Sequence, residues 1–135
     1  MKLLLDTDTC IYALKGDGNV LDRLMRRSRS DVAVSVITEA ELRTGAAKSS
    51  APVKTAHLLA NFLRPLSVVD FTSPDAVAYA HLRAKLEREG TPIGPLDTLI
   101  AAQALARKLV LVTNNEREFR RVPGLRLENW AGAAR

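Results

Sequence analysis

Three acidic residues stand where a folded chain could bring them together. Asp6 directly follows the apolar run 3–5, Asp97 follows Gly94-Pro95 at the predicted start of a helix, and Glu41 lies in a predicted helix after a second apolar strand. In open parallel sheets, ligands bind beyond the carboxyl ends of the strands, so we expect these carboxylates to converge there. Converging carboxylates repel one another, and the hard cation Mg²⁺, which prefers oxygen ligands, resolves that repulsion. Such a site can activate water and stabilise a phosphate during in-line displacement.

Each of these acids also has a purely structural interpretation. Asp6 could only cap the following helix, and Asp97 could only complement a helix dipole, which contributes about 0.3–1 kcal/mol. Glu41 could be a solvated surface acid. Glu39 lies two residues before Glu41 and therefore points to a different face of the helix, so only one of the two should share the site.

The elements that must position these residues alternate between strand and helix. Strands are predicted at 2–5, 32–35, 66–69 and 109–113, with a weaker one near 125–127, and helices at 7–15, 20–29, 38–47, 53–64, 73–89 and from 94 onward. The last helix is apolar nearly all round, which indicates burial. The unbroken apolar run 109–113 is typical of a central parallel strand. The pattern indicates one α/β domain over residues 1–135, a parallel sheet with helices on both faces.

The composition is typical of a globular protein without disulfides or membrane-spanning segments. The chain has 135 residues, 47% of them hydrophobic, with a net charge of +5, which suits a globular protein with a polyanionic partner. The single cysteine, Cys10, excludes an internal disulfide and is expected to be a small buried hydrophobe in a reducing cytoplasm. His57 and His81 are expected to be structural or surface residues. The first residues do not form a signal peptide, and no apolar run approaches the ~20 residues that span a membrane.

Four motifs in order resemble the PIN-domain ribonucleases, specifically the VapC-type toxins of bacterial toxin–antitoxin modules. They lie at residues 3–12, 35–45, 91–102 and 112–125, and they contain Leu5-Asp6-Thr7-Asp8, Thr38-Glu39-Ala40-Glu41, Pro95-Leu96-Asp97 and Thr113-Asn114-Asn115. Each motif alone is a weak signal, but the four together cover nearly the whole chain at suitable spacing.

The resemblance implies a five-stranded parallel sheet with strand order 3-2-1-4-5. It assigns Asp6, Glu41 and Asp97 as the acidic core and as metal ligands, with Mg²⁺ or Mn²⁺ as the metal. It also implies an RNA substrate, as in related toxins that cut structured RNAs such as tRNA anticodon loops. The implied partners are a second copy in a homodimer and a small antitoxin that blocks the site in a higher assembly.

The sequence departs from the family pattern at two positions. Asp8 stands where relatives often have asparagine, and it either adds charge beside the site or serves only as a cap. Asn115 stands where many PIN domains have a fourth acid. Glu118 or Glu116 could supply that acid, or Asn115 could hold a water at the metal. We favour Glu118, because the Arg117-Glu118-Phe119 run is itself typical of the family.

The resulting hypothesis is hydrolysis by water, leaving a 5′-phosphate and a 3′-hydroxyl. Asp6 and Asp97 would hold the metal directly, Glu41 would act through water, and Thr113 and Asn115 would hydrogen-bond the phosphate or the metal's waters. The arginines expected to follow the RNA backbone are Arg26, Arg27, Arg29, Arg120 and Arg121, although a solvated basic face explains them equally well.

Two alternatives remain at this stage. Leu3-Leu4-Leu5-Asp6-Thr7-Asp8 also resembles the first motif of haloacid-dehalogenase-like phosphatases, but that class needs a downstream lysine, and no lysine follows Lys108. The second alternative is a non-catalytic binding module on the same fold, for which the missing fourth acid is the argument.

Overall fold

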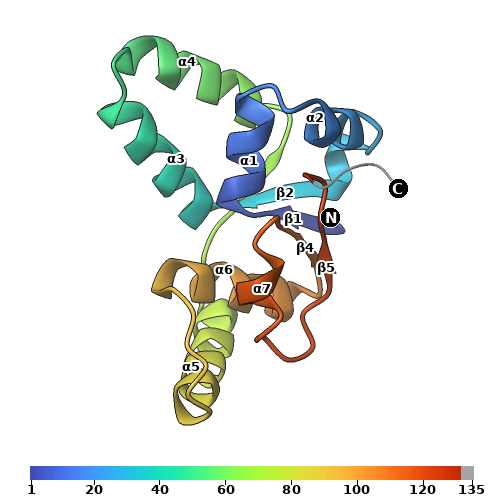
Figure 1. Ribbon diagram of the computed structural model, residues 1–135, viewed down its shortest axis with the longest axis vertical. Coiled ribbons are helices and arrows are strands. Elements are labelled where there is room, and N and C mark those ends of the chain that lie inside the picture. Colours follow the sequence, from blue (N-terminus) through green and yellow to red (C-terminus); the bar gives the residue numbers. More distant parts are fainter. Residues whose placement is uncertain (132–135) are drawn as a thin grey trace.

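Five short parallel strands form a single sheet in the computed structural model, which describes residues 1–131 (Figure 1). The strand order is β3-β2-β1-β4-β5, so β1 is central and pairs with both β2 and β4. The bounds are β1 Leu3–Leu5, β2 Val32–Ser35, β3 Ser67–Val69, β4 Val110–Val112 and β5 Leu127–Glu128. This confirms the predicted α/β class and strand order. β5 begins two residues later than predicted, and its side chains are only partly buried.

Helices connect the strands and cover both faces of the sheet (Figure 1). Their bounds are α1 Thr7–Leu14, α2 Gly18–Met25, α3 Val36–Lys48, α4 Pro52–Leu63, α5 Ser73–Arg88, α6 Pro95–Arg107 and α7 Glu116–Phe119, with a short 3-10 turn at Arg29–Asp31. Most helix boundaries differ from the prediction by one or two residues, and two of the differences have structural interest. α2 ends at Met25 instead of Arg29, and α3 begins directly after β2, because the Ser35 side chain accepts the Ile37 N–H at 3.0 Å and caps the helix.

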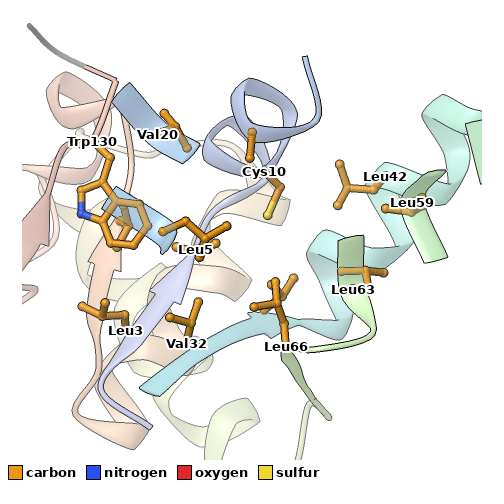
Figure 2. Close-up of a cluster of buried hydrophobic side chains, with 14 residues drawn as sticks. Leu3, Leu5, Cys10, Val20, Val32, Leu42, Leu59, Leu63, Leu66 and Trp130 are labelled. Atoms are coloured by element: carbon orange, nitrogen blue, oxygen red, sulfur yellow. The ribbon is translucent and has the colours of Figure 1, made fainter. Parts of the chain in front are cut away.

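The two faces of the sheet carry separate hydrophobic clusters. Leu3 and Leu5 point to the face covered by α1 to α4, whereas Leu4 points to the face covered by α5 to α7, as expected for strand residues that alternate. Figure 2 shows the first cluster, in which Trp130 packs near Leu5 and Cys10 lies between α1 and the sheet. Trp130 is only 1% exposed, so the segment after β5 completes this core. Cys10 is fully buried, as predicted, and burial raises the pKa of its thiol.

A buried carboxylate ties α5 to α6, the helix that carries Asp97. Asp75 accepts the Thr72 backbone N–H at 2.8 Å in a capping box and pairs with Arg107 of α6 at 3.1 Å. Burial opposes ionisation of Asp75, but the Thr72 N–H and the Arg107 guanidinium outweigh it and lower its pKa. Arg107 and Gln103 also donate to the Asp70 carbonyl at 2.9 and 2.8 Å. These bonds fix α6 against the segment that follows β3.

No helix within residues 1–131 is both long enough and apolar enough to cross a lipid bilayer.

Candidate functional site

The carboxyl ends of β1, β2 and β4 meet at one edge of the sheet, because Leu5 is level with Val34 on one side and with Val112 on the other. A cavity of about 310 Å³ opens at this edge. Its lining is mostly polar and comes from α1, α3, α6 and α7 or the residues beside them: Asp6, Thr7, Asp8, Ile11, Glu41, Asp97, Asn115 and Phe119. Asp6, Glu41 and Asp97, predicted to converge from separate elements, therefore line one cavity.

Asp6 is both the helix cap and a member of the cavity. Its backbone N–H donates to the Val112 carbonyl at 3.0 Å, and its carboxylate accepts the Thr9 N–H at 2.8 Å. The side chain is almost fully buried, so burial raises its pKa, and hydrogen bonds from Thr113 and Thr9 only partly offset this effect. The structural and functional interpretations of Asp6 thus hold together, since capping fixes the carboxylate where the cavity needs it.

Glu41 reaches the cavity from α3 and is held by α1. The Thr7 hydroxyl donates to its carboxylate at 2.6 Å and lies 3.1 Å from the Thr38 hydroxyl. Glu39 instead pairs with Arg43 at 2.6 Å, which confirms that only one of the two glutamates shares the site. The role of Thr7 was missed by the sequence analysis. Its position in the first turn of α1, next to Asp6, is the signal that could have indicated it.

Asp97 and Glu118 lie side by side near the N-terminus of α6. A Cβ atom added to Gly94 would lie 3.5 Å from Oδ2 of Asp97 and 3.7 Å from Oε1 of Glu118, so both carboxylates flank this residue. Burial, followed by the negative charges of Glu118, Glu41 and Asp6, raises the pKa of Asp97 to about 7. Near neutral pH the protonated Asp97 can therefore donate a hydrogen bond to Glu118.

Glu118 is stabilised in its ionised form. Burial would raise the pKa of Glu118, but the Gly94 N–H at 2.9 Å, the Asn115 amide at 2.7 Å and the charge of Arg121 outweigh it and lower the pKa. Glu116, the other candidate for a fourth acid, turns away. Its carboxylate accepts from Asn129 at 2.9 Å and pairs with Arg120 at 3.5 Å. The structure thus places Glu118, and not Glu116, beside Asp97, with Asn115 as its hydrogen-bond donor.

One predicted contact is corrected by the structure. Thr113 was expected to hydrogen-bond the phosphate or the waters of a metal, but it is fully buried. Its hydroxyl accepts the Asn115 N–H at 2.9 Å and favours the ionised form of Asp6, so Thr113 acts inside the protein and not on a bound substrate. Asp8 lines the cavity with an exposed side chain and does not cap α1, since Asp6 does so. His57 and His81 are exposed on α4 and α5, away from this cavity.

The acids form an open cluster and not a finished metal site. Over residues 1–131, no three His, Cys, Asp or Glu side chains already have an arrangement able to hold a metal ion. The donor chemistry nevertheless fits a divalent cation, because Asp6, Glu41 and Asp97 line one cavity. The pKa of Asp97 is raised by burial first and then by the neighbouring negative charges, which a cation would offset. Binding a cation would require Asp97 to lose its proton and the side chains to rotate toward one another.

Comparison with known proteins agrees with the fold and the motif order. The model of the PIN domain family matches residues 3–125. The tRNA(fMet)-specific endonuclease VapC of Salmonella typhimurium is 42% identical over 96% of this chain and 98% of its own length, and that of Shigella flexneri is 37% identical over 97% and 99%. Among solved structures, VapBC2 from Rickettsia felis, bound to a DNA fragment from its promoter, aligns with a TM-score of 0.91 and 38% identity over 96% of this chain and 99% of its own. These matches leave no support for the phosphatase alternative. The chain belongs to the PIN-domain family, among the VapC ribonucleases of toxin–antitoxin systems.

Proposed function

We propose that this protein is a Mg²⁺-dependent endoribonuclease that acts as the toxin of a toxin–antitoxin module and cuts a structured RNA, with tRNA as the first candidate. The observation that carries the proposal is the convergence of Asp6, Glu41 and Asp97 on one cavity at the carboxyl edge of the sheet. The relatives named tRNA(fMet)-specific endonucleases support the choice of substrate. Mn²⁺ is expected to substitute for Mg²⁺, because it too accepts carboxylate oxygens.

The role that we propose for each acidic residue follows from the hydrogen bonds that fix its side chain. A bound divalent cation supplies charge stabilisation at the phosphate and lowers the pKa of water. Asp6, fixed by the Thr9 N–H, and ionised Asp97 would hold the cation, and Glu41, fixed by Thr7, would orient water near it. Glu118, which is kept ionised by Gly94 and Asn115, would bind the cation through water.

Water, and not the 2′-hydroxyl, is the nucleophile in this scheme, so the products carry a 5′-phosphate and a 3′-hydroxyl. The scheme is tested by incubating total RNA with the purified protein in Mg²⁺ or in EDTA. The Asp97→Asn variant is assayed in parallel. We expect cleavage that is lost with EDTA and in the variant. Cleavage that survives either change, or products with a 2′,3′-cyclic phosphate, would refute the mechanism, and absence of cleavage under all conditions would favour a non-catalytic binding module.

An apolar groove beside the site suits the antitoxin partner. The groove, of about 630 Å³, lies between α1, α3 and α4, and its walls include Leu14, Leu42, Leu58 and Phe62. Ile11 lines both this groove and the acidic cavity, so the two are adjacent. We propose that an amphipathic segment of the antitoxin occupies the groove and presents a basic side chain to the carboxylates, which blocks the cation site.

Charge reversal tests the groove with a matched control. Leu58 is 55% exposed on the groove wall, and Val77 is 58% exposed on α5, outside it. We expect Leu58→Glu to escape inhibition by the cognate antitoxin while it still cuts RNA, and Val77→Glu to remain inhibited. Equal inhibition of both variants would place the antitoxin elsewhere. The family resemblance also implies a homodimer, and sedimentation of the purified toxin tests this.

A further inference from the structure

The edge of the sheet opposite the acidic cavity carries a row of cations. All five strands are parallel, so they all begin at this amino edge. Lys2 immediately precedes β1, Arg126 immediately precedes β5, and Lys108 lies two residues before β4. Arg29 opens the 3-10 turn that leads into β2. Basic residues therefore stand before four strands, whereas acidic residues gather beyond their carboxyl ends.

Backbone hydrogen bonds place three of these residues on neighbouring strands. The Lys2 carbonyl accepts the Val110 N–H at 3.0 Å, and the Arg126 carbonyl accepts the Leu111 N–H at 2.9 Å. The Arg126 guanidinium also donates to the Lys108 carbonyl at 3.1 Å. Because neighbouring strands are about 4.8 Å apart, Lys2, Lys108 and Arg126 occupy a row only about 10 Å long. We call these three residues the amino-edge row.

The positive charges of the amino-edge row are not neutralised by residues 1–131. All three side chains belong to exposed residues, and none forms an ion pair within the described chain. By contrast, three of the arginines predicted to follow RNA are already paired: Arg26 with Asp22, Arg27 with Glu128 and Arg120 with Glu116. Asp31 lies next to Lys2 and forms no ion pair within residues 1–131, and its single negative charge leaves the three cations with a net positive charge.

We infer that the amino-edge row is a second RNA-binding surface, which holds the phosphate backbone of a large structured substrate away from the bond that is cut. This inference rests on the proposed ribonuclease function. Closely spaced, unpaired cations suit a partner whose negative charges repeat at short intervals, as phosphates do. β1 is three residues long, so roughly 10 Å of strand separates the row from the cavity. An RNA larger than the domain can contact both edges at once, whereas a short stem–loop held in the cavity offers fewer phosphates to the row.

The surface is tested by removing its charges without touching the site. The combined variant Lys2→Gln, Lys108→Gln, Arg126→Gln is compared with the matched control Lys48→Gln, Lys54→Gln, Arg88→Gln. The control removes three exposed cations of α3, α4 and α5 that form no ion pair with any described residue, and it changes the net charge equally. Binding to an intact tRNA transcript and to its isolated anticodon stem–loop is measured in EDTA in an Asp97→Asn background, from about 50 to 200 mM salt.

We expect the amino-edge variant to bind the intact tRNA about 10- to 100-fold more weakly, with a salt dependence reduced by about two to three counterions. Its binding to the stem–loop should weaken less than its binding to the intact tRNA, and its cleavage of saturating stem–loop should stay unchanged when Asp97 is restored. Equal losses in the two triple variants would show that net charge alone is responsible and would overturn the inference, as would unchanged binding to tRNA. If the wild-type protein cuts no RNA, the proposed function fails, while the comparison of the two triple variants in EDTA still decides whether the row binds RNA.

Discussion

Asp97 should destabilise the metal-free protein at alkaline pH, and Asp97→Asn should relieve this. The folded state holds its proton more tightly than the unfolded state, in which the pKa is near 3.8. Ionising Asp97 therefore costs the folded state increasing free energy as the pH rises from about 4 to about 7, and the cost is absent below pH 4. A rise of the pKa to about 7 corresponds to at most about 4 kcal/mol. Since the side chain is partly exposed, solvent screening reduces the expected cost to about 1–2 kcal/mol.

The assay is urea unfolding in EDTA at pH 4 and pH 8, followed by the fluorescence of Trp130, the single tryptophan of the chain. Asp97→Asn should be more stable than the wild type at pH 8 and equal to it at pH 4. Asparagine can still donate to Glu118, as the protonated acid does. Glu39→Gln is the control. It breaks only the exposed pair with Arg43, so it should cost about 0.5 kcal/mol or less. A variant that is less stable than the wild type at pH 8, or a gain that does not depend on pH, would refute the electrostatic argument.

Mg²⁺ should make the wild type more stable than Asp97→Asn at pH 8. An ion that binds only the folded state stabilises it by about 2.7 kcal/mol at a concentration 100 times its dissociation constant. The wild type at pH 8 should gain stability when EDTA is replaced with Mg²⁺, whereas Asp97→Asn should gain little. Equal gains in both proteins would show that Asp97 does not hold the ion.

Three further predictions concern the fourth acid, the α5–α6 tie and the core. Glu118→Gln should slow RNA cleavage by about 10- to 100-fold, as loss of a supporting group at a metal site does, whereas Glu116→Gln should stay within about twofold of the wild type in the same assay. Asp75→Ala should cost about 3 kcal/mol in urea unfolding at pH 7, because it leaves Arg107 without its carboxylate. Since the pKa of Asp75 is lowered, this loss should shrink as the pH falls below about 4, and a constant loss would contradict the ion-pair explanation. Trp130→Ala should lower the free energy of unfolding, measured by thermal denaturation, by about 3–5 kcal/mol. A change below about 1 kcal/mol would show that the segment after β5 does not complete the core.

The strands and the positions of Asp6, Glu41 and Asp97 were predictable because short sequence patterns mark the ends of the strands and the starts of the helices. The run 109–113 is apolar throughout, since β4 is buried on both faces, and the glycine and proline before Asp97 mark the start of α6. Asp6 could be placed because it follows a strand and caps a helix, two signals at one residue.

Other features depend on packing that no local pattern reveals. The sequence around Thr113 does not indicate whether its side chain faces a substrate or the interior. Only the structure shows that Thr113 is buried and therefore cannot contact a substrate. The choice between Glu116 and Glu118 depends on the turn of α7, a four-residue helix too short to be recognised from periodicity. The amino-edge row required the strand order itself, because Lys2 and Arg126 become neighbours only through β4.

The strand order also has a consequence for the timing of synthesis. β1 is made first, yet it pairs with β4 more than a hundred residues later, and the site needs α7 as well. At ~5–20 residues per second, a ribosome takes roughly 3–11 s to travel from Leu63 to Glu118. The helices that form the apolar groove, α1, α3 and α4, all end by Leu63. The segments that form the surface we propose for the antitoxin are therefore synthesised several seconds before the nuclease site is complete.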